Sequence, residues 1–320
     1  MPNKTMHEWA SEFVLYKRNL GYKYITSEYY IFRYCAYSAA NHPTSTIPCR
    51  ASVVGFLELM SQTNISVSGF GNVLREFARF IHKNGNQQAY MLPSKRVPSR
   101  PPAAPPHFFT TQEIETFFSR CDEAKKIKEY PGREFTIPAL FRLIYACGLR
   151  SSEARLLKTE DVNLPNNYFD IKDAKWGTSR RVFISDELSA YLNIYEMEIS
   201  KINPQREYFF TNRHSKHYSA SFIFTNFKKI WCDCFPDFPK GNRPRVIDFR
   251  HHFVWKNMNQ WAEKGLDFNE LAPYLMKYLG HKHLKSTLYY FHLVPEFHSK
   301  LIEMNIKTED LLPEVGVYEY

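Results

Sequence analysis

The chain has 320 residues, of which 44% are hydrophobic and 16% aromatic, a composition that excludes a disordered protein and allows two folded domains. Its formal net charge of +9 favours a polyanionic partner. No apolar run reaches membrane-spanning length, and the polar N-terminus does not resemble a secretion signal. The sequence therefore predicts a cytoplasmic protein without membrane contact.

The first part of the chain has a helical pattern and an excess of basic residues. Apolar side chains recur at helical spacing in four segments, within residues 9–20, 26–34, 51–61 and 68–83. Thr26 is predicted to cap the second of these helices. In the last helix, Arg75, Arg79 and Lys83 follow one another at four-residue spacing on the face opposite the apolar side chains. This basic stripe suits phosphate contact, and a solvated face is the alternative.

Residues 93–108 form a proline-rich connector. Proline at this density ends helices and favours an extended chain, so a domain boundary is predicted here. Three cations in the connector, Lys95, Arg96 and Arg100, would suit a segment that runs along phosphate groups. A solvated linker with incidental charge is the alternative.

The chain after the connector alternates predicted helices with one predicted hairpin. Thr110 and Glu113 form a capping-box pattern at the start of a helix. An apolar helix over residues 137–147 ends at Gly148, and Ser151 or Ser152 is predicted to cap the next, short helix. Two segments have strand character, 168–172 and 180–184. Further helices are predicted over residues 186–203, 219–234, 248–264, 269–279, 285–291 and 295–305. The expected fold is mainly α with a small antiparallel β-sheet.

Five residues in this part of the chain have the chemistry needed to cleave a phosphodiester: Arg150, Lys175, Arg250, His281 and Tyr290. Guanidinium groups pair with phosphate oxygens and can stabilise the charge of a transition state. A desolvated lysine in the hairpin connection can protonate the leaving oxygen, and a phenol beside cations can be the nucleophile. Lys172 and Tyr289 are the neighbouring alternatives for these two roles.

This chemistry requires neither a metal nor another cofactor, and we predict none. Cys232 and Cys234 have the wrong spacing for a zinc knuckle, and no second ligand pair lies at a suitable distance.

The order and contexts of the five residues resemble those of the tyrosine recombinase (phage integrase) family, in which nine positions likewise separate the histidine from the tyrosine. The resemblance implies an N-terminal helical core-binding domain (1–92), a catalytic domain (109–305) and a tail (306–320) that docks on a neighbouring subunit. It implies site-specific recombination of double-stranded DNA through a 3′-phosphotyrosyl intermediate. The active form would be a homotetramer on paired sites, with or without a partner recombinase.

The resemblance also implies supporting roles for other residues. Glu153 would orient Arg150, His281 would bind the scissile phosphate, and His251 would be a structural residue after the second arginine. Basic residues of the N-terminal part and connector would contact DNA: Arg75, Arg79, Lys83, Lys95, Arg96 and Arg100. The long spacer between Arg250 and His281 resembles that of some transposons and integrative elements, which indicates a mobile-element recombinase.

The sequence departs from the family pattern at Ile247. The usual motif is His-x-x-Arg, whose histidine transfers a proton and binds phosphate, and an isoleucine can do neither. His252 could approach the phosphate, but it lies about 200° from Arg250 around a helix. This departure leaves a second reading open, a DNA-binding protein of the same fold without efficient chemistry. A type IB topoisomerase, which uses the same chemistry, is a third.

Overall fold

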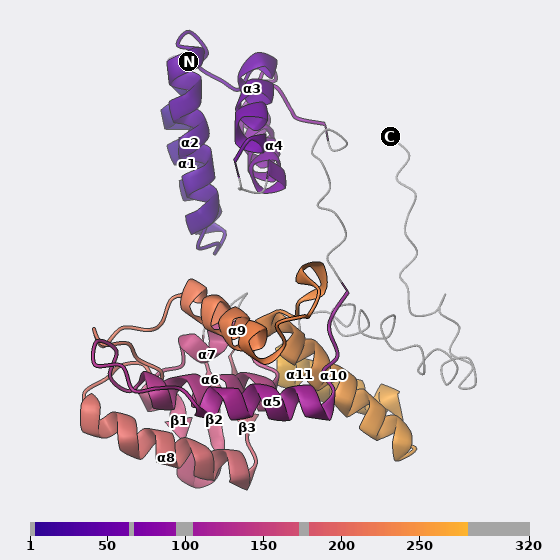
Figure 1. The fold of residues 1–320 in the computed structure, drawn as a ribbon. Helices are drawn as coiled ribbons and strands as arrows, with labels where there is room; N and C mark the ends of the chain where they lie inside the picture. Colours follow the sequence, from indigo (N-terminus) through magenta and orange to yellow (C-terminus); the bar gives the residue numbers. More distant parts are fainter. Residues whose placement is uncertain (1–3, 64–66, 94–104, 173–178, 281–320) are drawn as a thin grey trace. The chain divides into compact units, whose positions relative to one another are not determined.

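The structure, a computed structural model, describes residues 4–63, 67–93, 105–172 and 179–280 (Figure 1). The chain divides into two compact units, Met1–Ala103 and Ala104–Tyr320. Each unit has a hydrophobic core of its own. The helices predicted over residues 285–291 and 295–305 lie outside the described residues.

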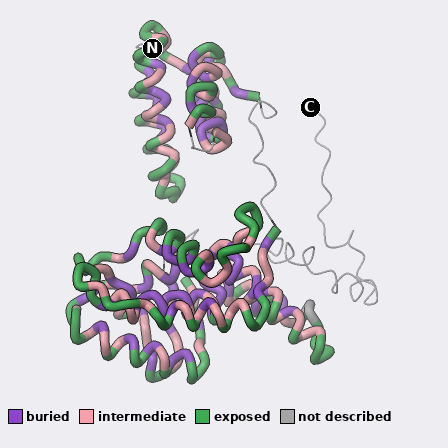
Figure 2. The backbone as a smooth tube through the Cα atoms, viewed as in Figure 1, coloured by how far each residue is buried: buried purple, intermediate pink, exposed green. Residues whose placement is uncertain are grey.

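The described part of the N-terminal unit is helical, as the spacing of its apolar residues predicts. Its helices are α1 (Met6–Asn19), α2 (Ile25–Asn41), α3 (Arg50–Ser61) and α4 (Val67–Lys83). Aromatic rings from all of them fill the core: the ring centroids of Phe13 and Phe77 are 5.4 Å apart, and those of Phe56 and Phe70 are 5.2 Å apart. Figure 2 shows the resulting alternation, in which each helix has buried residues along one side and exposed residues along the other.

One predicted cap in this unit is wrong. Helix α2 begins at Ile25, so Thr26 lies inside the first turn, and the residue before the helix is Tyr24 in a left-handed conformation (φ 49°). The ring of Tyr24 packs edge-on against Phe13, with centroids 5.6 Å apart. Phe13 and Tyr24 are 11 residues apart in sequence. The residue before α2 is therefore part of the aromatic core, which local cap preferences do not predict.

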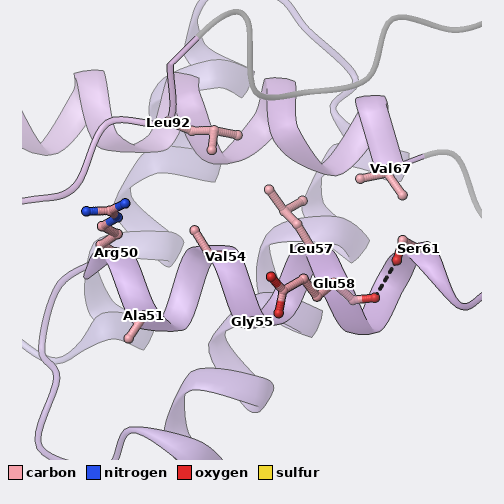
Figure 3. Close-up of a pocket in the computed structure, with 9 residues that line it drawn as sticks. All are labelled: Arg50, Ala51, Val54, Gly55, Leu57, Glu58, Ser61, Val67 and Leu92. Atoms are coloured by element: carbon pink, nitrogen blue, oxygen red, sulfur yellow. Dashed lines mark hydrogen bonds between the residues drawn. The ribbon is translucent and has the colours of Figure 1, made fainter.

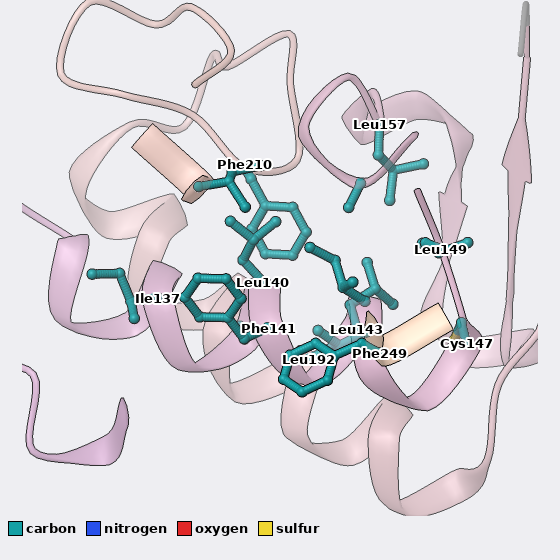
Figure 4. Packing of buried hydrophobic residues seen from close by; sticks show 14 of the residues in the cluster. Ile137, Leu140, Phe141, Leu143, Cys147, Leu149, Leu157, Leu192, Phe210 and Phe249 are labelled. Atoms are coloured by element: carbon teal, nitrogen blue, oxygen red, sulfur yellow. The ribbon is translucent and has the colours of Figure 1, made fainter. Parts of the chain in front are cut away.

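The second unit is built around one central helix. Its helices are α5 (Thr111–Asp122), α6 (Arg133–Cys147), α7 (Ser151–Arg155), α8 (Asp186–Ile202), α9 (Ala220–Cys234), α10 (Val246–Glu263) and α11 (Phe268–Leu279). Helix α6 contacts α5, α7, α8 and α10. Figure 4 shows Leu140 and Phe141 of α6 beside Leu192 of α8 and Phe249 of α10, all of which are at most 1% exposed. This packing explains why most residues of α6 are apolar and buried.

The predicted hairpin is confirmed as β2 (Tyr168–Ile171) and β3 (Arg180–Phe183), which pair antiparallel. A third strand, β1 (Val162–Asn163), pairs with β2 on its other side. Its two residues are too few to produce a recognisable alternation, so the sequence did not predict it. Ile171 stands opposite Arg180 in the register. Because opposite residues share a face, Arg180 lies on the buried side of the hairpin.

The end of α6 and the start of α7 together position Arg150. Helix α6 ends at Gly148, as predicted, in a left-handed conformation (φ 58°). The predicted serine cap of α7 is wrong, because the cap residue is Arg150. Its backbone N–H donates to the Glu153 carboxylate over 2.9 Å, so the acidic side chain satisfies the helix start. The capping box of Thr110 and Glu113 at α5 is confirmed.

Candidate active site

Three arginine side chains surround one buried carboxylate, that of Glu153, whose side chain is 4% exposed. Its Oε1 accepts from Arg150 Nη1 at 2.7 Å and from Arg180 Nη1 at 3.1 Å, and its Oε2 accepts from Arg180 Nη2 at 3.0 Å. Arg250 Nη1 lies 3.8 Å from Oε2. We call Arg150, Glu153, Arg180 and Arg250 the arginine cluster.

Arg250 is the most deeply buried member of the arginine cluster, with 2% of its side chain exposed. Its Nη1 donates to the carbonyl oxygen of Gly148 at 2.9 Å, and its Nη2 donates to that of Leu279 at 2.7 Å. The preceding residue, Phe249, is fully buried in the core and anchors this turn of α10. Backbone oxygens from two distant turns therefore set the direction of the guanidinium.

The arginine cluster has an excess of positive charge. Burial by itself would raise the pKa of Glu153, but the hydrogen bonds and charge of Arg180, the backbone N–H of Arg150 and the charge of Arg250 outweigh burial and hold that pKa below its usual range. The carboxylate is therefore ionised, so the four residues of the arginine cluster carry a formal net charge of +2. Of the three arginines in the cluster, Arg150 is the most exposed, with 25% of its side chain accessible. An anion such as a phosphate would complete the charge balance.

Of the predicted site residues, the structure brings Arg150, Arg250 and Glu153 together. Lys175, His281 and Tyr290 lie outside the described residues, as do Lys95, Arg96 and Arg100. The described chain on either side does reach the arginine cluster: Arg180 Nε donates to the carbonyl oxygen of Tyr278 at 2.6 Å. The hairpin and the end of α11 therefore both meet at the cluster.

Arg180 is a member of the cluster that the sequence interpretation missed. A signal was available in the strand alternation, because Arg180 and the fully buried Val182 are two residues apart and share a face of β3. An arginine on the apolar face of a strand requires a buried partner, and the partner here is Glu153.

The two histidines after Arg250 differ in their surroundings. His252 is 6% exposed, and its Nδ1 accepts from the backbone N–H of Phe109 at 3.2 Å. Burial lowers the pKa of His252 to about 4, so the ring is a neutral part of the core. His251 is partly buried, with its Nε2 3.9 Å from Asp248 Oδ1. Ile247, in the first turn of α10, is 38% exposed. His252 is thus not positioned to replace a histidine at that place.

The basic stripe of α4 is divided in the structure. Arg75 Nε donates to the carbonyl oxygen of Leu92 at 3.0 Å, and its Nη1 donates to Asn72. Arg79 and Lys83 are exposed, and within the described residues no ion pair is formed by either. Arg75 therefore holds the segment after α4, whereas the other two cations are available to a ligand.

Grooves lie on the described surface of both units. One, of about 840 Å³, runs along α3 in the N-terminal unit and has Arg50 and Glu58 as its charged residues (Figure 3). Figure 3 shows Val54 and Leu57 of α3 facing the segment of Leu92. The second groove, of about 860 Å³, is lined by Arg180 and by aromatic side chains, namely Phe183, Phe253, Trp261, Tyr274 and Tyr278. This second groove includes a member of the arginine cluster, Arg180.

Within the described ranges, every helix is too short or too polar to span a membrane. No three His, Cys, Asp or Glu side chains of those ranges lie together in a way that could hold a metal ion.

Comparisons with known proteins agree with this architecture. The phage integrase family matches residues 107–296. The chain is 27% identical over 300 residues to y4rB of Sinorhizobium fredii, a protein whose name describes it as an integrase/recombinase, covering 91% of this chain and 94% of that one. It is 25% identical over 246 residues to tyrosine recombinase XerD of Lacticaseibacillus casei, covering 75% and 77% of the two chains.

Solved structures share the fold. The integrase of transposon Tn1549, in complex with transposon right end DNA, superimposes with a TM-score of 0.63 at 14% identity, covering 93% of this chain and 99% of that one. XerH recombinase bound to its difH substrate has a TM-score of 0.59 at 17% identity, covering 87% and 78%. The fold and these relatives define the class of protein, a tyrosine-type DNA recombinase, which breaks and rejoins DNA. The chain belongs to the phage integrase family, which matches more than half of its residues.

Proposed function

We propose that this recombinase cuts and rejoins specific DNA sites through a covalent 3′-phosphotyrosyl intermediate on Tyr290. The observation that carries the proposal is the convergence of Arg150 and Arg250 on Glu153, which leaves an excess of positive charge at a partly open position. Such preorganised charge stabilises the additional negative charge of a pentacoordinate phosphorus and costs no reorganisation during the reaction.

In the proposed cleavage step, the Tyr290 oxygen attacks phosphorus and its phenolic proton passes to water. The bond from phosphorus to the 5′ oxygen breaks, and Lys175 supplies the proton that converts this oxygen to a hydroxyl. Arg150 and Arg250 bind the two non-bridging oxygens, and His281 donates a further hydrogen bond to the phosphate. In the rejoining step, a 5′-hydroxyl of another strand attacks the phosphotyrosine and releases the phenol. The number of phosphoester bonds is unchanged, so no external energy source is needed.

The alternative general acid, Lys172, is less suited to that role. Its ammonium group forms an ion pair with Asp161, whose side chain is 5% exposed. This pairing raises the pKa of Lys172 above its ordinary value, because the hydrogen bond and charge of Asp161 favour the protonated form. A lysine that holds its proton more tightly is a weaker acid for a leaving oxygen, which favours Lys175.

We further propose that residues 1–92 and the connector 93–108 bind the DNA backbone around the cleavage site, while residues 109–305 carry the chemistry. Arg79 and Lys83 of α4, with Lys95, Arg96 and Arg100 of the connector, would supply phosphate contacts. Recombination needs two sites, so the active form would be a tetramer on paired double-stranded sites, with residues 306–320 docked on a neighbouring subunit.

The proposal is tested with a nicked duplex whose sequence is first selected from a random pool by its binding to the protein. The nick lets the short strand diffuse away after cleavage, so the covalent intermediate accumulates. In the presence of a chelator, the wild type is expected to give a slowly migrating protein–DNA band on a denaturing gel. Tyr290→Phe should abolish the band, and Tyr289→Phe, the matched control, should retain it.

Three outcomes would contradict the proposal. Salt-sensitive DNA binding without a covalent band in the wild type would favour a DNA-binding protein without chemistry. A band that persists in Tyr290→Phe would assign the nucleophile to another residue. Relaxation of supercoiled DNA by a monomer, without paired sites, would indicate topoisomerase activity in place of recombination.

A further inference from the structure

The guanidinium of Arg180 is bound entirely by protein oxygens. Its Nη1 and Nη2 donate to the two oxygens of Glu153 at 3.1 and 3.0 Å, and its Nε donates to the Tyr278 carbonyl at 2.6 Å. Only 6% of the side chain is exposed. Arg180 therefore differs from Arg150, which is 25% exposed and can reach a ligand.

The bidentate pair between Arg180 and Glu153 restricts how Arg150 can bind the same carboxylate. A carboxylate and a guanidinium pair most favourably through two parallel hydrogen bonds. Because Arg180 occupies both oxygens in this way, the side chain of Arg150 is held through Nη1 alone, at 2.7 Å from Oε1. In the absence of Arg180, Arg150 could rotate to pair with both oxygens. The contacts of Arg180 thus keep one edge of the Arg150 guanidinium unpaired with Glu153.

Arg180 also joins segments that are far apart in the sequence. It begins β3, directly after the hairpin connection that contains Lys175, and it binds Glu153 of α7, 27 residues away. It binds the last turn of α11 through Tyr278, 98 residues away. The next turn is packed tightly against it: a Cβ at Gly280 would lie 3.0 Å from Arg180 Nη1. Gly280 (φ 66°) is the last described residue before His281.

We propose that Arg180 is a positioning residue of the cleavage site, which holds the free edge of Arg150 toward the scissile phosphate and fixes the end of α11 beside it. This inference rests on the proposed function, because it assigns a role in that reaction. Arg180 touches neither phosphate nor nucleophile in this role and acts through Glu153 and Arg150.

The test is single-turnover cleavage of the nicked duplex at saturating DNA, with Arg180→Lys and Arg180→Gln. Lysine keeps the charge but cannot bind both carboxylate oxygens and the Tyr278 carbonyl in one plane. We expect the cleavage rate to fall about 100-fold, the size of effect seen when one preorganised donor is lost, with the Kd for DNA changed about twofold or less. The matched control is Arg181→Lys. Arg181 is exposed and pairs with Asp170, so its rate should stay at the wild-type value.

A second substrate separates positioning from general damage to the fold. In a methylphosphonate duplex, a methyl group replaces one non-bridging oxygen, so the reacting phosphorus has less negative charge for a guanidinium to stabilise. If Arg180 acts through Arg150, the defect of Arg180→Lys should shrink about tenfold or more on this substrate, since the stabilisation that is lost is electrostatic. A purely structural role predicts the same loss on both substrates.

The outcomes distinguish this inference from the proposed function. If the wild type forms no covalent adduct, the proposed function fails. If the wild type cleaves and Arg180→Lys cleaves at the same rate, the inference fails while the function stands. An equal loss on both substrates, or unfolding of both Arg180 variants in thermal melts, would also overturn it in favour of a structural role.

Discussion

The guanidinium of Arg250 donates to the backbone carbonyl of Gly148 over 2.9 Å, although 102 residues separate them. Gly148 also ends α6 two residues before Arg150. Helix α10 approaches this turn so closely that a Cβ on Gly148 would lie 2.7 Å from Cδ1 of Phe253. The spacing between the two phosphate-binding candidates is therefore set by a glycine turn and the helix packed on it.

Gly148→Ala should lower both stability and cleavage. The left-handed backbone (φ 58°) and the contact with Phe253 each oppose a side chain, and such strain costs about 1–3 kcal/mol. Urea unfolding followed by tryptophan fluorescence would measure the loss. The control is Gly241→Ala, where a Cβ meets nothing within 4 Å, and its change should stay within about 0.5 kcal/mol. Wild-type stability in Gly148→Ala would show that Phe253 moves aside without cost.

Ile247→His should raise the cleavage rate. Ile247 is 38% exposed in the first turn of α10, one turn before Arg250, so a histidine can replace it without loss of core packing. An added proton donor near the phosphate is expected to increase the rate about tenfold or more, within the usual range for acid–base catalysis. Single-turnover cleavage with Ile247→Leu as the control measures this. An unchanged rate would mean that another group of this protein already performs that step.

Arg79→Gln and Lys83→Gln should each weaken DNA binding and reduce its dependence on salt. Each lost phosphate contact is expected to lower the slope of log K against log salt by about 0.9. Titrations of a labelled duplex over a range of salt concentrations give the slope. Arg18→Gln removes the same charge from a residue paired with Glu28 at 2.6 Å, and should leave the slope nearly unchanged. Equal effects of all three variants would indicate a net-charge effect without a defined contact face.

Arg75→Gln should behave differently from its neighbours in the stripe. Its guanidinium holds the carbonyl of Leu92, so its loss is expected to lower stability by about 1–2 kcal/mol, as for a charge-assisted hydrogen bond. Urea unfolding would detect this change, while the salt slope should change less than it does for Arg79→Gln. A larger effect on the slope than on stability would reassign Arg75 to the DNA contact.

Acid should destabilise the second unit through His252. Burial, with smaller contributions from the nearby charges of Lys256 and His107, lowers the pKa of His252 from 6.5 to about 4, and Glu113 opposes this shift. The folded state therefore binds fewer protons than the unfolded state between these values. The stability due to neutral His252 is complete above about pH 6.5 and is lost as the pH falls toward about 4, by about 2 kcal/mol after allowance for screening.

The measurement is urea unfolding at about pH 7 and about pH 4.5, in the wild type and in His252→Gln. The glutamine carbonyl can still accept from the backbone N–H of Phe109 but has no site to protonate. The variant should therefore lose less stability on acidification than the wild type. Equal losses in the two proteins would place the acid sensitivity in other groups.

Local patterns predicted those parts of the fold that depend on neighbours in sequence. The helical spacing of apolar residues, the Thr110 and Glu113 box and the end of α6 at Gly148 are confirmed, because each depends on atoms within one or two helical turns. Thr26 and the two serines before Glu153 were wrong as caps. The residue before α2 is Tyr24, whose ring packs in the core. The start of α7 is satisfied by Glu153, whose carboxylate also belongs to the arginine cluster.

By itself, the sequence determined the class of the protein through its resemblance to the tyrosine recombinase family, and residue type and spacing sufficed to predict helices, one hairpin and two arginines suited to a phosphate. The contact of Arg150 with Glu153 was expected, whereas only the tertiary structure decided what else Glu153 binds and what Arg250 contacts. Glu153 binds Arg180, which is 27 residues away, and Arg250 binds the carbonyls of Gly148 and Leu279. Pairing over such separations depends on which elements pack together, and a buried guanidinium is tolerated only where that packing supplies its oxygens.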